Sequence, residues 1–113
     1  MKGALIVAAV GEIGTGLALL IVPSLVGRLL LGGELTGIAI PVARVAGIAL
    51  VALGLACWPG TPRAGMLTYS AAVTLYLAYL GVTGSSTGLL LWPAVVLHAI
   101  MTTLLARAPA TKT

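Results

Sequence analysis

The stretch from Ile40 to Trp58 reads Ile-Pro-Val-Ala-Arg-Val-Ala-Gly-Ile-Ala-Leu-Val-Ala-Leu-Gly-Leu-Ala-Cys-Trp, and its single charged residue is Arg44. Its length and apolar character are typical of a transmembrane helix. An arginine at mid-helix costs about 2.5 to 3.5 kcal/mol on insertion scales, whereas each Leu, Ile or Val contributes about −0.3 to −0.6 kcal/mol. Insertion of this helix is therefore close to break-even, and we expect Arg44 to face a partner inside the protein.

The composition excludes an ordinary soluble domain. Of the 113 residues, 60% are hydrophobic and 7% are charged, whereas soluble domains have about 25% charged residues. The net charge of +4 reflects six Lys and Arg residues, spread singly, and two acids. Because these bases form no patch, nucleic acid is not an expected partner. The expected partners are the lipid bilayer and other membrane helices, in a homo-oligomer or with other proteins.

The apolar runs predict an all-α membrane protein with a single domain, residues 1–113, built as a bundle of four transmembrane helices. A run of about 20 residues matches the hydrocarbon core at about 1.5 Å per residue. Prolines, glycines and an uncharged polar loop separate the runs. We expect spans at about 3–22, 37–58, 64–82 and 88–107, with a short interfacial helix at about 24–31 after the first span.

The basic residues favour one orientation. Four spans place the two ends of the chain and the loop at Arg63 on the same side of the membrane. That side holds four of the bases, namely Lys2, Arg63, Arg107 and Lys112. The other side holds only Arg28 as a base, accompanied by Glu34. By the positive-inside rule we expect both termini in the cytoplasm and a location in the bacterial inner membrane.

Glu12 is the only acid inside another apolar run, near the middle of the first span. A buried ion pair with Arg44 would hold the first two spans in register, and we favour this structural role. The alternative is a proton or substrate site, since ionisable groups inside a membrane are candidates for function. Small residues surround Glu12 at helical spacing and favour close helix contact.

Three more polar side chains, Tyr76, His98 and Thr102, lie at central depth. The hydroxyl of Tyr76 is too deep to reach the interface and needs an internal partner. For His98 we favour a neutral ring that bonds Tyr76, Thr102 or a backbone carbonyl; the alternative is a proton relay or a ligand contact. A single His and a single Cys predict no metal centre or disulfide, and no catalytic or nucleotide-binding motif is present. We therefore expect no catalytic residue, cofactor or metal.

Several short motifs resemble those of a known group. The first span ends as Leu17-Ala-Leu-Leu-Ile-Val-Pro23, the second starts with Ala43-Arg44-Val-Ala-Gly47, and a Tyr-containing third span precedes Leu91-Trp92-Pro93-Ala94 and His98. Together they resemble small bacterial four-span membrane proteins of uncharacterised function, which are loosely DoxX-like. The resemblance covers nearly the whole chain and implies a four-span fold without an established activity.

Glu12-Ile-Gly-Thr15 is similar to a second pattern, Glu-x-x-Gly-Thr, although it is one residue shorter. That pattern belongs to the small multidrug resistance exporters, which have a similar length and number of spans. The resemblance implies that Glu12 would be the site shared by the proton and the exported cation.

These observations lead to three hypotheses for function. The first is a non-enzymatic accessory or self-assembling membrane subunit, in which a Glu12–Arg44 pair orders the core and Tyr76 and His98 complete its hydrogen bonds. The second is a proton-coupled transporter of a small hydrophobic cation with Glu12 as the carrier. The third is a membrane subunit of an oxidoreductase that binds quinone or haem at His98.

Overall fold

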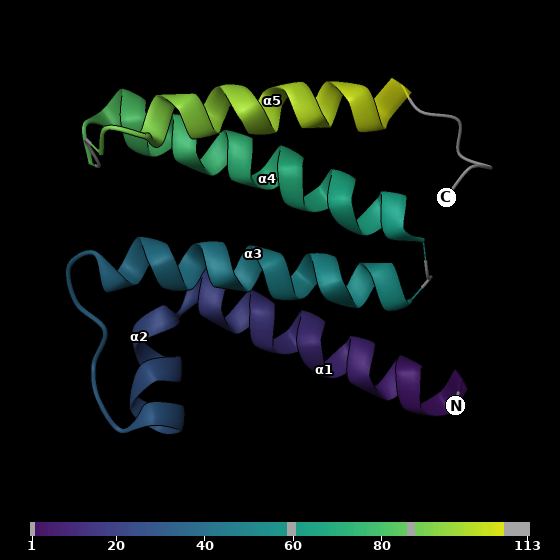
Figure 1. Cartoon of the computed structure of the whole chain (residues 1–113). Coiled ribbons are helices and arrows are strands. Elements are labelled where there is room, and N and C mark those ends of the chain that lie inside the picture. The colour runs from purple at the N-terminus through teal and green to yellow at the C-terminus, as the bar shows by residue number, and fades with distance from the viewer. Residues whose placement is uncertain (1, 59–60, 86–87, 108–113) are drawn as a thin grey trace.

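Every regular element in the described residues is helical, as the sequence predicted (Figure 1). The computed structural model describes residues 2–58, 61–85 and 88–107. The long helices are α1 (Lys2–Ile21), α3 (Ala39–Cys57), α4 (Pro62–Thr83) and α5 (Leu91–Arg107). Two short elements follow α1, namely α2 (Pro23–Val26) and the π-helical turn η1 (Gly27–Leu31). Residues 59–60 of the turn, 86–87 of the polar loop and Lys112, which the orientation used, lie outside the described residues.

Three helices are long and apolar enough to cross a membrane: α1 over Gly3–Ile21, α3 and α4. Helix α5 is also apolar but has 17 residues, a length of about 25 Å. It begins at Leu91 and not near residue 88 as expected, because the N–H of Leu91 donates to the Gly88 carbonyl, 3.1 Å away, in a preceding turn. The helices indicate a multi-pass membrane protein.

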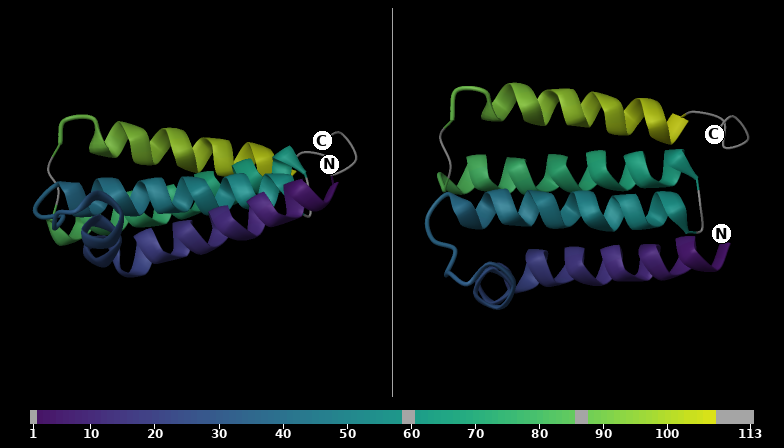
Figure 2. Two further views of the ribbon diagram at one scale, coloured as in Figure 1. Left: turned by 90° about the horizontal axis from the view of Figure 1, so that it is seen from below. Right: turned by 60° about the horizontal axis from the view of Figure 1, so that its bottom comes forward.

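The four long helices lie side by side in an open row, in the order α1, α3, α4, α5 (Figures 1 and 2). The Cα atoms extend over 41 × 34 × 15 Å, so the row is less than half as thick as it is wide. Within the described residues α1 and α5 form the two edges of this row and do not pack on each other. In this row the polar residues that we expected to share one core are divided between different helix pairs.

Glycines let neighbouring helices in the row approach closely. A Cβ atom on Gly16 of α1 would lie 2.5 Å from the carbonyl oxygen of Gly47 in α3, and the reverse substitution meets the Gly16 carbonyl at the same distance. Gly65 of α4 lies similarly close to the Ala52 carbonyl of α3, whereas Gly81 of α4 faces the ring of Trp92 in α5. Small residues therefore set the spacing and the register of the row, as in many membrane helix pairs.

The chain leaves the direction of α1 at Pro23. Proline has no N–H and cannot continue the hydrogen-bond pattern of the preceding turn, and α2 and η1 run across the end of α1 (Figures 1 and 2). Gly32 then ends η1 with a φ of 81°, a left-handed conformation suited to glycine. The hydroxyl of Ser24 donates to the carbonyl of Leu35 at 3.0 Å. This bond holds the loop that leads back to α3.

Candidate functional site

Arg44 in α3 reaches across to the end of α1. Its Nε donates a hydrogen bond of 3.2 Å to the carbonyl oxygen of Leu20. Leu20 lies in the last turn of α1, where carbonyls lose their helical partners because the chain breaks at Pro23. The guanidinium therefore satisfies a backbone acceptor at the negative end of the helix dipole. Sequence reasoning missed this partner, although the proline that ends α1 was the signal for free carbonyls one turn earlier.

Glu12 and Arg44 do not form the ion pair that we expected. Helices α1 and α3 are antiparallel, and the contact between Gly16 and Gly47 places Arg44 level with Leu20. Glu12 is eight residues before Leu20, or about 12 Å along α1. Opposite charge suggested the partner, but the packing of small residues determined the register of the two helices and kept the charges apart.

Glu12 is half-buried beside the interface of α1 with α3. Within the described residues its carboxylate makes no hydrogen bond, while the nearest residues along the outer side of α1, Ala8 and Thr15, are exposed. A Cβ atom on Gly11 would meet nothing within 4 Å. The carboxylate thus borders an open face of small residues at the edge of the row.

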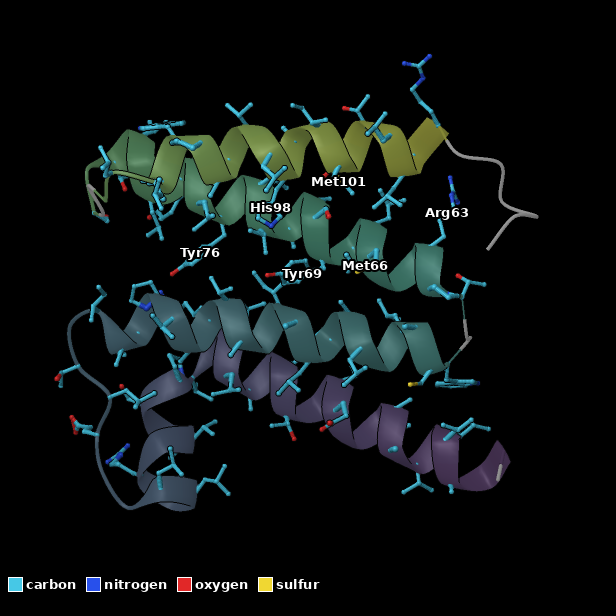
Figure 3. The ribbon with its side chains drawn as sticks, viewed as in Figure 1. Arg63, Met66, Tyr69, Tyr76, His98 and Met101 are labelled. Carbon is cyan, nitrogen blue, oxygen red and sulfur yellow. The ribbon has the colours of Figure 1, made fainter. Side chains whose placement is uncertain are left out.

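Arg44 and Tyr76 are brought together at one cavity. This cavity, called the Arg44 cavity below, has a volume of about 910 Å³ and lies between α3, α4 and α5. Figure 3 shows Tyr76 pointing from α4 toward α3. Two other hydroxyl-bearing residues, Tyr79 and Ser85, also line it, as do the loop glycines Gly37 and Gly88. Sequence reasoning missed Tyr79, although its spacing of three residues from Tyr76 places both on one side of a helix.

His98 and Thr102 lie away from the Arg44 cavity, in the interface between α4 and α5. Nδ1 of His98 is 2.8 Å from the carbonyl oxygen of Ala94, and a neutral ring makes this contact as a donor. Of the three partners expected for His98, the structure thus shows a backbone carbonyl. The ring of Tyr69 packs edge-on beside it, with centroids 5.8 Å apart (Figure 3). The hydroxyl of Thr102 donates to the backbone carbonyl of His98 at 2.7 Å.

The side chains at these positions define which ligands they could hold. In the part of the chain that the structure describes, no group of three or more His, Cys, Asp or Glu side chains could hold a metal ion. Cys57 is a free thiol, half-buried at the end of α3. The Arg44 cavity instead gathers a guanidinium, which only donates hydrogen bonds, and hydroxyl groups, which can donate or accept them.

No family model matches this chain, and no curated protein or solved structure matches it significantly.

Proposed function

We propose that this chain is a non-enzymatic membrane subunit that assembles with a second copy of itself through the outer face of α1. All four long helices cross the bacterial inner membrane, with both termini in the cytoplasm, and α2 with η1 lies in the interface. The positive-inside bias of the basic residues supports this orientation, and the apolar character of α5 supports its crossing despite its 17 residues.

The observation that carries the proposal is the position of Glu12. It lies near the middle of α1, an edge helix in which only 11% of the span is buried. A carboxylate at this depth is unfavourable in contact with lipid and normally pairs with another protein group. Since Arg44 bonds Leu20 instead and no described residue bonds the Glu12 carboxylate, we assign its partner to a second copy of the chain.

The face beside Glu12 suits another helix. Ala4, Ala8, Gly11 and Thr15 follow one another at spacings of four, three and four residues, and all are exposed. Small residues at such spacing let two membrane helices approach closely and exchange hydrogen bonds. In a twofold dimer the same face meets itself, so the Thr15 hydroxyl of each copy comes close to the Glu12 carboxylate of the other. A second copy therefore packs closely against this face and provides a hydrogen-bond donor for Glu12.

The test is the number of copies per particle, measured by native mass spectrometry in detergent and by subunit counting in lipid bilayers. We expect the unchanged chain to be a dimer. Ala8→Leu fills the small-residue face, and we expect it to raise the dissociation constant of the dimer about tenfold or more, as about 1–3 kcal/mol of overpacking predicts.

Ala46→Leu is the matched control, because Ala46 is an exposed alanine of α3 that lies outside the outer face of α1. It should leave the dimer unchanged. A monomeric unchanged chain would contradict the proposal, and so would an equal effect of the two alanine substitutions.

A further inference from the structure

The Arg44 cavity contains an incompletely used arginine. Within the described residues only Nε of the guanidinium donates a hydrogen bond, to Leu20. No buried polar side-chain atom of these residues lacks a partner, so the terminal nitrogens of Arg44 are not enclosed by protein. They belong to a residue that lines an open cavity of about 910 Å³. Ionisable groups inside a membrane mark candidate ligand sites, and this arginine faces a cavity with room for an acceptor.

The other groups of the cavity favour an anionic acceptor. Tyr76 and Tyr79 provide hydroxyl groups, which can donate to an anion alongside the guanidinium. The hydroxyl of Ser85, which also lines the cavity, bonds Thr83 at 2.9 Å. Neither acid of the chain lines the cavity. Helices α3 and α5 also begin at its rim, after Gly37 and Gly88, and the positive ends of their dipoles add to the attraction.

The surroundings of the cavity favour an anion that carries a hydrocarbon chain. A second cavity of about 280 Å³ adjoins it and shares Ile38, Pro41, Leu80 and Leu91 with it. The remaining lining residues of this second cavity, Val42, Val45 and Leu77, are all apolar. A polar cavity with a cationic group beside an apolar one matches an amphiphile in both parts.

We propose that Arg44, together with Tyr76 and Tyr79, binds the phosphate headgroup of an anionic phospholipid, with an acyl chain against the apolar residues of α3 and α4. The geometry of an arginine fork suits phosphate oxygens, to which it donates two parallel bonds. The bond from Nε to Leu20 orients this fork and ties it to the end of α1. Since no residue of α1 lines the cavity, the site is independent of the proposed dimer face.

The test is a binding titration of the full chain, purified in an uncharged detergent and followed by native mass spectrometry. The probes are phosphatidylglycerol, phosphatidylcholine and inorganic phosphate. We expect phosphatidylglycerol to bind about tenfold or more tightly than phosphatidylcholine, since hydrogen bonds to a charged group contribute about 1.5–3 kcal/mol. Equal binding of the two lipids would overturn the proposal. Equally tight binding of inorganic phosphate would also overturn it, because the cavity would then be a site for free anions.

Matched variants test the residues. Arg44→Gln should weaken phosphatidylglycerol binding about tenfold, and Tyr76→Phe about threefold, as expected for the loss of one neutral donor. Arg107→Gln removes the same charge at an exposed position on the opposite end of α5, and Tyr69→Phe removes a hydroxyl beside His98. Both controls should bind as the unchanged chain does.

If a control weakens binding as much as its partner variant, the site is elsewhere. Because Arg44→Gln also removes a bond to α1, the result for Tyr76→Phe, which keeps the ring, decides the question if the arginine variant does not fold.

Discussion

Arg44 and Arg63 both donate hydrogen bonds to backbone carbonyls at the end of a neighbouring helix, at opposite ends of the long helices, but they use different numbers of donors. Arg63 in the first turn of α4 donates from Nε to the Leu105 carbonyl at 2.9 Å and from Nη2 to the Ala106 carbonyl at 3.1 Å. Arg44 makes a single bond of this kind, to Leu20. Each arginine satisfies carbonyls at the carboxyl end of a neighbouring helix, where a cation is favourable. Arg63 therefore uses two donors of its guanidinium for the protein, whereas Arg44 uses one, Nε.

The helix pairs that these arginines join also differ in how their glycines are used. In the α1–α3 pair the backbones of Gly16 and Gly47 touch each other. In the α4–α5 pair Gly81 receives the ring of Trp92, a side chain that is 47% exposed. A backbone cannot move without moving its helix, but a partly exposed ring can rotate. The first pair is therefore the more rigid one, and it is this pair that holds Arg44 in place.

Among the substitutions that test this comparison, Gly47→Leu is expected to lower the free energy of unfolding most. A side chain at this position enters the backbone of α1, and we expect a loss of about 3 kcal/mol in the free energy of unfolding. Gly81→Leu displaces mainly the Trp92 ring and should cost about 1 kcal/mol. Unfolding in mixed micelles with a denaturing detergent measures both. A smaller loss for Gly47→Leu than for Gly81→Leu would contradict the difference in rigidity.

Arg44→Leu and Arg63→Leu test the two arginines directly. Loss of Arg44 leaves the Leu20 carbonyl without its donor inside an apolar layer, and we expect a cost of about 1–2 kcal/mol. Loss of Arg63 should cost less, about 0.5 kcal/mol, since one of its two bonds is exposed and water can replace it. The same unfolding measurement compares the two variants. A larger loss for Arg63→Leu would show that its bonds to the end of α5 stabilise the protein more than the bond of Arg44 to the end of α1.

The smallest expected effect is the coupling between Glu12 and Arg44. The side chains are separated along α1 and share no partner, so Glu12→Gln and Arg44→Leu should be additive within about 0.3–0.5 kcal/mol in a double-mutant cycle on unfolding. An ion pair would instead give a coupling energy above that limit. Such a coupling would restore the pair that the sequence led us to expect and would assign both charges to the interior of the α1–α3 pair.

The positions of the helices followed from local rules. Apolar runs of sufficient length predicted the four long helices to within a few residues, and Pro23, Gly32 and the polar loops marked their ends. The short helix after the first span was also indicated by its pattern. These features depend on residues within a few positions of one another, so a sequence contains nearly all the information needed.

Interactions between helices could not be obtained in this way. Charge predicted that Glu12 would meet Arg44, but the structure places Arg44 at Leu20. Of the alternative partners predicted for His98 the structure shows a backbone carbonyl, that of Ala94, and it places the ring of Tyr69 beside His98. Nothing in the sequence states the register of two helices, because that register depends on which small residues can meet across the interface. A shift of two turns changes every partner without changing the hydrophobic pattern.

The amino-acid sequence alone therefore determined that this protein is helical, is apolar enough for a membrane and has few charged residues. Apolar runs and helix-breaking residues determine the helices through local interactions. Only the tertiary structure decided that the helices form an open row, that Arg44 caps α1, and that Arg44 and Tyr76 line one cavity. The physical reason is the close contact of Gly16 with Gly47. That contact brings two backbones together at one register and thereby sets the depth of every polar side chain in α1 and α3.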